Sequence, residues 1–491
     1  MTMRTLVRKP GIRSFALLCL VALMAIGPTT FAASDAPRTK DRAPLGGSPR
    51  PLKLPQVQDT ALPNGLQVRV VEDHRFPLVT MKLAFRFGTT ADPGDLPGLC
   101  ESTAELLREG TAKMKSREIA DELAAIGGSL DSESGPDTVS LTGSSLSEFA
   151  DRLATLMAET TTHPSFPDSE VALRKENLKQ ELAQNRAQPS WLSRERFQRE
   201  IYGTSPYAVI SPTDASIEKL DRSKIADFHH RMFVPGSAVL VVVGDVDRAA
   251  MLSEVTAAFG SWSGQAAPAP SFLAPPPRSA RRVYLVDRPG SVQSDLRVGN
   301  LGIPRKDPLY YSALMLDGVV GAGTASRLFL IVREEKGYTY DAHSEYATLR
   351  GAGDWSAVTE VRTEVTKPAL EEVLKQVERM RSEKVTEAEL TSAKNYAGGI
   401  FTLQVERPAR LATLLAEQKI FDLPADELET HVARVNAVTP EDLLKAAQTL
   451  CDTSHAAIVV VGDGSKIRGD LGSFGPISVY NADGTSREVA P

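Results

Sequence analysis

AVLVVVGDVD, residues 238–247, and AAIVVVGDGS, residues 456–465, are two copies of one apolar segment that lie 218 positions apart. Each copy follows a helical pattern and a short polar turn, and each runs into Gly-Asp. A short run of β-branched residues between turn signals is typical of a buried strand. The recurrence therefore predicts that the chain contains one module twice.

The beginnings of the two predicted modules also match. RVVEDHRFPLVTMKLAFRFG, which ends at Gly88, aligns with VYLVDRPGSVQSDLRVGNLG, which ends at Gly302. In the first copy, β-branched and aromatic residues alternate with polar ones on both sides of EDHRFP, which predicts two strands joined by a turn. Helical patterns fill the middle of each copy. The sequence thus predicts the α+β class, with two tandem homologous modules, each an antiparallel-rich sheet with helices packed on it.

The first 33 residues have the composition of a secretory signal. Four basic residues and no acidic residue precede an apolar run, and Ala32 and Ala33 supply the small residues that signal peptidase prefers. The run has about 12 residues, short of the roughly 20 that a spanning helix needs, so a retained membrane anchor is the less favoured alternative. We expect a cleaved signal peptide, a mature protein without a membrane span, and a location in the periplasm or outside the cell.

The order of the remaining segments follows from the repeat and from composition. Proline and charge in one stretch, and proline in another, favour extended and flexible connections. The predicted segments are a signal peptide (1–33), a flexible leader (34–56), an N-terminal module (57–261), a proline-rich linker (262–280), a C-terminal module (281–468) and a C-terminal tail (469–491).

Charge and cysteine content narrow the range of functions. The formal net charge is −6, and loss of the signal peptide moves it to about −10. An acidic protein is a poor partner for nucleic acid or anionic lipid, so neither is expected. The mature chain keeps Cys100 and Cys451, which could form one disulfide or remain as buried thiols.

Several segments, in their order and spacing, resemble one family of zinc peptidases. They are LPNGLQVRVVED (62–73), FRFGT (85–89), PGLCESTAELLREGT (97–111), PYAVISPTDASIEKL (206–220), FHHRMFVPGSAVLVVVGDVD (228–247) and ASRLFLIVREEKGYTYDAHSEY (325–346). Together they resemble the pitrilysin or insulin-degrading-enzyme family, which includes the mitochondrial processing peptidases. The resemblance covers nearly everything between about residues 54 and 463.

The resemblance aligns the zinc motif of that family, His-x-x-Glu-His, with residues that are neither its histidine ligands nor its glutamate base. Its histidine positions fall on Glu101 and Glu105, its general-base position on Ala104, and its third, downstream ligand on Glu181. We therefore expect no metal in this chain. Because Glu101 and Glu105 are one helical turn apart, they could form an oxygen site with Glu181 that suits Mg²⁺ or Ca²⁺ better than Zn²⁺, although without a base. The favoured interpretation is three glutamates on solvated helix faces.

The second module keeps a pair that the family uses. The resemblance implies that Arg333 and Tyr340 hold the substrate backbone and stabilise the oxyanion, with Gly337 at the turn between them. A guanidinium and a phenol are strong donors that need not ionise during turnover. The alternative is that Arg333 pairs with a neighbouring glutamate and Tyr340 packs in a strand. The preceding GVVGAGTASRLF lacks the Lys-Ser or Lys-Thr of a phosphate loop and is interpreted as a turn before a helix at Ser326.

A lost zinc motif with a retained Arg/Tyr pair is similar to the non-zinc subunits of two-chain family members. The resemblance implies a periplasmic heterodimer in which a homologous partner brings zinc and base, this chain brings Arg333 and Tyr340 in trans, and unfolded peptides are cut. Alone, the chain should be inactive. The alternative is a peptidase-fold protein that has lost catalysis and binds peptides or scaffolds an envelope complex. A homodimeric enzyme built on the glutamate cluster is a weaker third hypothesis, because Ala104 is no base.

Overall fold

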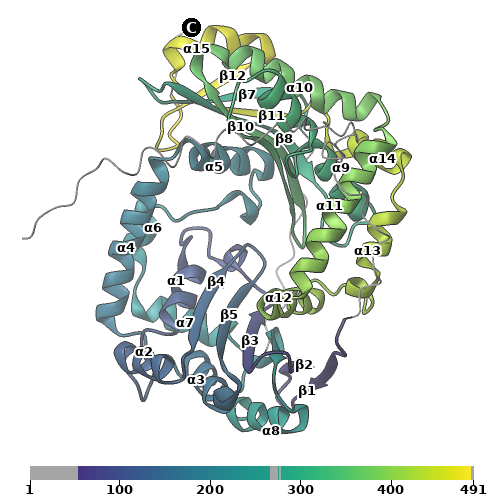
Figure 1. The fold of residues 1–491 in the computed structure, drawn as a ribbon. Helices are drawn as coiled ribbons and strands as arrows, with labels where there is room; N and C mark the ends of the chain where they lie inside the picture. The colour runs from purple at the N-terminus through teal and green to yellow at the C-terminus, as the bar shows by residue number, and fades with distance from the viewer. Residues whose placement is uncertain (1–53, 266–274, 276–277, 488–491) are drawn as a thin grey trace, which may run out of the picture. The chain divides into compact units, whose positions relative to one another are not determined.

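The computed structural model describes residues 54–265, 275 and 278–487 (Figure 1). The predicted signal peptide, most of the leader and residues 266–274 and 276–277 of the linker lie outside the described residues. Within the described ranges, the helices are too short or too polar to cross a bilayer.

Two six-stranded sheets organise the fold, one in each predicted module. The first contains β1 (Gln58–Ala61), β2 (Gln67–Glu72), β3 (Leu78–Phe85), β4 (Ser129–Ser134), β5 (Val139–Leu146) and β6 (Ala238–Gly244), in the order β1-β2-β6-β3-β5-β4. The second contains β7 (Arg282–Asp287), β8 (Gln293–Gly302), β9 (Ala342–Thr348), β10 (Gly353–Arg362), β11 (Ala457–Gly462) and β12 (Ile477–Tyr480), in the order β12-β7-β11-β8-β10-β9. The predicted α+β class and the antiparallel-rich sheets are confirmed.

The two repeated apolar segments occupy equivalent places. β6 runs parallel to β2 and antiparallel to β3, and β11 runs parallel to β7 and antiparallel to β8. The predicted duplication is therefore visible in the strand order. Only the first strand in each order differs, because β1 comes from the start of its module and β12 from the end of the chain.

The C-terminal tail predicted from residue 469 needs correction. Helix α15 (Gly464–Leu471) continues past that boundary, and β12 pairs in parallel with β7. Val479 of β12 is buried in the core of the second module. The second module therefore extends at least to Tyr480.

Helices cover the sheets. In the first module they are α1 (Leu99–Leu106), α2 (Ser116–Ala125), α3 (Ala150–Thr162), α4 (Asp168–Arg186), α5 (Pro189–Tyr202), α6 (Asp214–Lys219), α7 (Arg222–Met232) and α8 (Arg248–Phe259). In the second they are α9 (Tyr310–Val320), α10 (Thr366–Ser382), α11 (Glu387–Val405), α12 (Pro408–Ile420), α13 (Glu427–Ala437), α14 (Pro440–Leu450) and α15. Cys100 and Cys451 are free thiols buried in different cores, so they do not form a disulfide.

Each sheet buries one face against helices of its own module and the other against a helix of the opposite module. In β6, Leu240 and Val242 face the first module's core, whereas Val239, Val241 and Val243 pack with α12. In the second sheet, α5 of the first module covers β8 and β11 (Figure 1). Because both faces are covered, these central strands are continuously apolar rather than alternating.

Candidate functional site

The helix that carries the zinc-motif positions is capped by a residue from outside the motif. Gly98 precedes α1 with φ 96°, a left-handed conformation that favours glycine. The Asp92 carboxylate accepts hydrogen bonds from the backbone N–H groups of Gly98 (2.8 Å) and Cys100 (2.7 Å). This contact satisfies donors that a helix start leaves open. It fixes the beginning of α1 and hence the direction of the side chains that follow.

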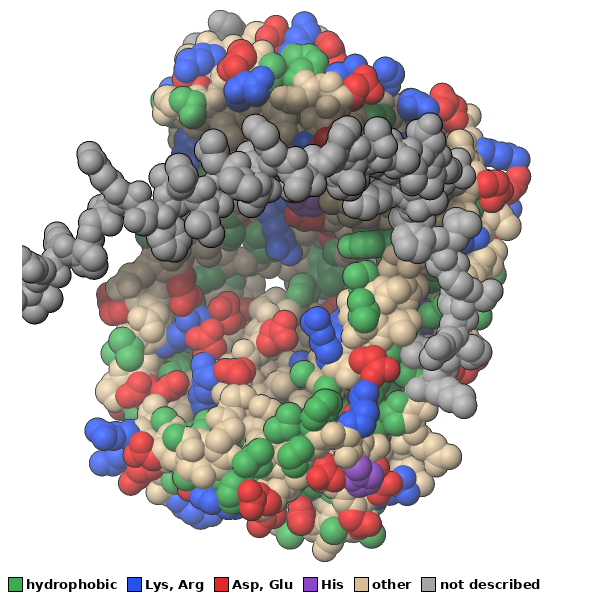
Figure 2. Space-filling model, viewed as in Figure 1, with side chains coloured by type: hydrophobic (Ala, Val, Ile, Leu, Met, Phe, Trp, Pro, Cys, Tyr) green, Lys and Arg blue, Asp and Glu red, His purple; other side chains and the backbone are tan. Residues whose placement is uncertain are grey.

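The motif positions lie within one turn of each other on α1 and differ in burial. Ala104, at the general-base position, is 0% exposed in the core of the first module. Glu101 and Glu105, one turn apart, are half-exposed and point toward α4, where both contact Arg174. Figure 2 shows acidic side chains gathered with a few basic ones over α1 and α4. No side chain that could act as a base occupies position 104.

An arginine joins the three glutamates. Arg174 Nη2 lies 3.0 Å from Glu101 Oε1, and its Nη1 lies 2.8 Å from Glu105 Oε2 and 3.0 Å from Glu181 Oε1. The Arg174 side chain is only 6% exposed, whereas the three carboxylates are half-exposed. The glutamates therefore lie partly exposed on their helix faces, but Arg174 joins them, so they do not form a bare oxygen site.

The electrostatics of this cluster are those of a guanidinium among carboxylates. Burial raises the pKa of the Glu105 carboxyl, Arg174 opposes that shift, and Glu101 and Glu181 add to it. In the described part of the chain, no three His, Cys, Asp or Glu side chains are placed to hold a metal ion. The donors are all oxygens and their centre is filled by Arg174, so the residues do not fit zinc.

Sequence reasoning missed Arg174 and Asp92. Arg174 lies seven residues before Glu181, which is two helical turns along one face of α4, so an opposite-charge search at helical spacing could have found it. No sequence pattern identifies Asp92, because its role depends on how the segment before α1 folds back onto the start of that helix.

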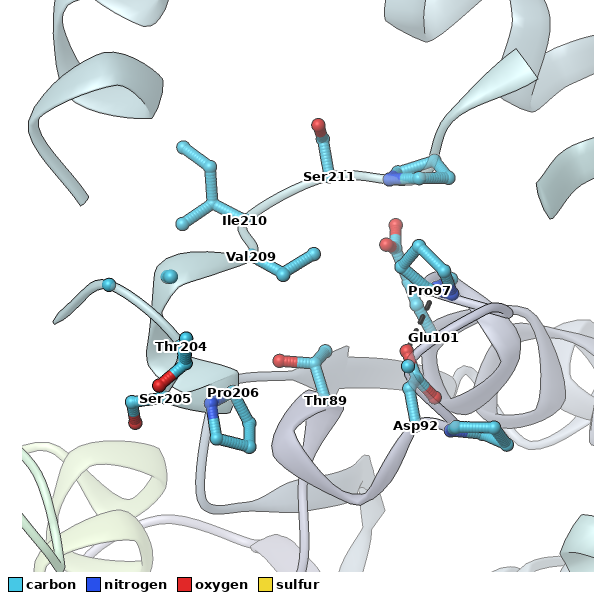
Figure 3. A pocket seen from close by; sticks show the side chains of 16 residues that line it. Thr89, Asp92, Pro97, Glu101, Thr204, Ser205, Pro206, Val209, Ile210 and Ser211 are labelled. Atoms are coloured by element: carbon cyan, nitrogen blue, oxygen red, sulfur yellow. Dashed lines mark hydrogen bonds between the residues drawn. The ribbon is translucent and has the colours of Figure 1, made fainter. Parts of the chain in front are cut away.

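A cavity of about 330 Å³ adjoins Glu101. Its walls come from the segment before α1 and from residues 203–212, and Figure 3 shows Asp92 and Glu101 on one side with Val209 across from them. Its lining contains no Lys, Arg or His. Burial raises the pKa of Asp92 to about 7, although hydrogen bonds from the backbone N–H groups of Cys100 and Gly98 lower it. The cleft next to the motif positions is therefore open and lined by two acids.

Arg333 and Tyr340 come together in the second module. Arg333 Cζ lies 4.9 Å from the centroid of the Tyr340 ring and 4.4 Å from that of Phe329. Tyr340 is 84% exposed and precedes β9, so it does not pack in a strand. The alternative is an ion pair between Arg333 and a neighbouring glutamate. Among the described residues, its one ionic contact is with Glu334, at 3.5 Å between Arg333 Nε and Glu334 Oε1.

The backbone around this pair is unusual. Phe329–Glu335 form a π-helix rather than the regular helix expected after Ser326, and Gly337 follows with φ 62°. Single π-turns are rare and occur frequently at functional sites. The wide turn and the left-handed glycine carry the chain from Arg333 back to Tyr340, which explains why residues seven apart contact each other.

The duplicated counterpart of the motif positions holds no ligands. The alignment that pairs Gly88 with Gly302 places Met315, Gly318 and Val319 opposite Glu101, Ala104 and Glu105. Met315 and Gly318 line a cavity of about 290 Å³ between α9, α11 and α12. The three aligned positions of the second module therefore carry no carboxylate, although Asp317, Glu417 and Glu427 line the same cavity.

Two family models match the chain. The model described as insulinase, peptidase family M16, matches residues 67–210, which include α1 and Glu181. The model described as the peptidase M16 inactive domain matches residues 219–396, which include Arg333 and Tyr340.

Relatives of similar length span most of the chain. A protein of Streptomyces coelicolor named as an uncharacterized zinc protease is 22% identical over 399 residues, covering 80% of this chain and 86% of the relative. A protein of Helicobacter pylori named as a non-peptidase homolog is 23% identical over 396 residues, covering 79% of this chain and 90% of the relative.

Solved structures share the fold. A peptidase M16 inactive domain from Pseudomonas fluorescens superposes with a TM-score of 0.77 at 25% identity, covering 83% of this chain and 98% of that one. A protease from Helicobacter pylori superposes with a TM-score of 0.78 at 19% identity, covering 83% of this chain and 100% of that one.

Proposed function

The chain belongs to the insulinase family of peptidases, M16, and we propose that it is the non-catalytic subunit of a two-chain zinc peptidase of that family. In this proposal a homologous partner carries the zinc site and the general base, and this chain supplies Arg333 and Tyr340 in trans. The substrates are unfolded peptides. The predicted signal peptide supports a periplasmic location.

One contrast carries the proposal. The zinc-motif positions of this chain are occupied by groups that bind each other, around Arg174. The Arg333–Tyr340 pair, in contrast, has an exposed phenol and a guanidinium with only one weak ionic contact. A protein without a substrate has no evident use for a π-turn that presents an arginine and a tyrosine together.

The chemistry of the pair suits acyl transfer. The Arg333 guanidinium can donate to the carbonyl oxygen of the bound peptide and keep that contact as negative charge develops on the oxygen. The Tyr340 hydroxyl can donate to the same oxygen or to the neighbouring backbone. Donors that are already in place lower the barrier without giving up a proton. Their contribution requires a nucleophile from elsewhere, because Ala104 supplies none.

The strand that follows Tyr340 supports peptide binding. β9 ends the strand order of the second sheet and pairs with β10 on one side only among the described strands. An extended peptide can add to such an edge through backbone hydrogen bonds, which select for length and disorder more than for sequence.

The proposal is tested by isolating the mature chain with its partners from the native periplasm and assaying cleavage of an unstructured peptide. We expect chelator-sensitive cleavage that travels with a second chain carrying His-x-x-Glu-His, and no cleavage by the tagged chain alone. If no such chain is recovered and no peptide is cut, the binding-protein hypothesis replaces this one. The Helicobacter relative is named as a non-peptidase homolog, which agrees with either candidate.

Variants of the pair sharpen the test. Arg333→Ala or Tyr340→Phe should lower the turnover number of the assembled complex by about 10²-fold, the loss expected for one oxyanion donor. Arg362→Ala is a matched control, because Arg362 is an exposed arginine of the same module that pairs with Glu364. Equal turnover in all three variants would show that Arg333 and Tyr340 do not contact the reacting peptide.

A further inference from the structure

The contacts of Arg174 coincide with the positions of the family's metal ligands. Its guanidinium touches the residues at both histidine positions, Glu101 and Glu105, and the residue at the third ligand position, Glu181. These residues come from two helices, α1 and α4, that a metal would otherwise join. A positive group therefore stands where the family has its ion.

Burial distinguishes this contact from ordinary surface pairs. Arg174 is 6% exposed. In contrast, Arg186, on the same helix, reaches Asp214 with a more exposed side chain, 29%. Exposed pairs of that kind contribute little, because water solvates both charges well when they separate. A buried guanidinium must keep its carboxylates, since removing them leaves an unpaired charge in a poor solvent.

The chemistry of the carboxylates also fits a fixed cation. Three carboxylates near one point repel each other; burial raises the pKa of Glu105, Arg174 lowers it, and Glu101 and Glu181 raise it further. Arg174 offers two nitrogens to three carboxylates, with Nη1 shared between Glu105 and Glu181. The planar fork of arginine matches carboxylates better than the single ammonium of lysine.

We infer that Arg174 is a built-in substitute for the metal ion. Its guanidinium neutralises the converted ligand positions, ties α1 to α4, and prevents a divalent cation from entering. The chain is thus not a zinc peptidase without its metal; it is a family member whose metal site has been filled by its own side chain. This inference concerns the first module and does not depend on the proposed function.

The test uses the full mature chain and the variant Arg174→Met, which keeps the apolar stem and removes the charge. We expect its unfolding temperature to fall by several degrees and to recover in millimolar Ca²⁺ or Mn²⁺. Equilibrium dialysis should then show about one bound ion per chain, because three carboxylates with no cation form an oxygen site. Wild type and Arg186→Ala should show neither response.

Two further variants separate the effect of the charge of Arg174 from the effect of its packing. Arg174→Lys keeps a charge and should be more stable than Arg174→Met; equal stability would show that Arg174 matters only through packing. Arg174→Met combined with Glu101→Gln, Glu105→Gln and Glu181→Gln should regain stability and lose cation binding. The inference is overturned if Arg174→Met is as stable as Arg186→Ala, if divalent ions do not rescue it, or if wild type binds the same ions equally well.

Discussion

At the scale of single residues, Arg174 decides what a restored zinc site requires. With Glu101→His and Glu105→His alone, the guanidinium would still fill the centre and would oppose a second cation. With Arg174→Ala added, the two histidines and Glu181 would present three ligands of the types that zinc uses. We expect the triple variant to retain stoichiometric zinc after dialysis, by elemental analysis, and the double variant to retain none.

Position 104 sets a separate limit on such a restoration. Ala104 is fully buried, so Ala104→Glu would place a carboxylate in the apolar core and cost several kcal/mol, on the order of other buried unpaired charges. The base of the family's motif therefore cannot simply be added back. Stoichiometric zinc in the Glu101→His, Glu105→His double variant, which keeps Arg174, would contradict the claim that Arg174 excludes a second cation.

His229 makes the stability of the first module depend on pH. Its Nε2 lies 2.7 Å from the carbonyl oxygen of Thr161, the ring stacks on Phe233, and burial lowers its pKa to about 4. Between pH 4 and 6.5 the unfolded chain therefore binds a proton that the folded chain does not, so stability present above that window is lost as the pH falls. Because the ring is partly exposed, we expect a contribution of about 1–2 kcal/mol.

The measurement is urea unfolding at pH 7 and pH 4.5. The loss of unfolding free energy on acidification should be smaller in His229→Gln than in wild type, whereas His230→Gln, its exposed neighbour, should behave as wild type. Asp92 acts in the opposite direction, since its raised pKa makes the folded chain bind the extra proton below about 7. That effect is common to all three proteins and cancels in the comparison. Identical acid losses would exclude His229 as a cause.

At the scale of elements, α12 shows how one module completes the other. Leu411, Ala412 and Leu415 form one face of this second-module helix and pack on β3 and β6 of the first sheet. Leu415→Ala should lower the unfolding free energy by about 2–4 kcal/mol, the usual cost of a cavity at a fully packed leucine. Ala409→Ser, at an exposed position on the same helix, should change it little. Denaturant curves check both, and a small loss at Leu415 would mean that the contact is loose.

The same elements show how far the sequence predicts the fold. Strands β2, β3, β6 and β11 follow from alternation and from the repeat, because both patterns are local. The amphipathic pattern of α12 predicts that one face is buried but cannot say against which sheet. β12 was missed because four residues give little periodicity, and the π-helix because its wide turn depends on tertiary packing rather than on propensity.

The candidate site divides in the same way. Arg333, Tyr340 and the zinc-motif positions are predicted from the family resemblance, which rests on motifs that can be read in the sequence. Their surroundings are not, because Arg174 lies about 70 residues from Glu101 in the sequence, and Asp92 acts through two backbone N–H groups. Chain segments far apart must pack before such partners can be identified.

At the scale of the whole molecule, the exchange of α5 and α12 makes the two modules one folding unit. Each sheet has one apolar face that the opposite module largely covers. Hydrogen bonds reinforce this arrangement: the Tyr202 hydroxyl donates to Asp354 (2.8 Å) and the backbone N–H of Arg350 donates to Asp137 (2.6 Å). A module expressed alone would expose a sheet face of this kind to water, and exposed apolar surface of that extent promotes aggregation.

A chain cut in the linker should therefore stay together. With a protease site inserted between residues 266 and 274, we expect the two fragments to co-elute in gel filtration as one species of the uncut size. Burial of side chains such as Leu411 and Phe197, at about 2 kcal/mol each, more than offsets the entropy gained on separation. Leu415→Ala should lower the urea concentration at which the fragments part. Two folded fragments that elute separately in buffer would show that the modules are independent domains and that the exchanged helices contribute little.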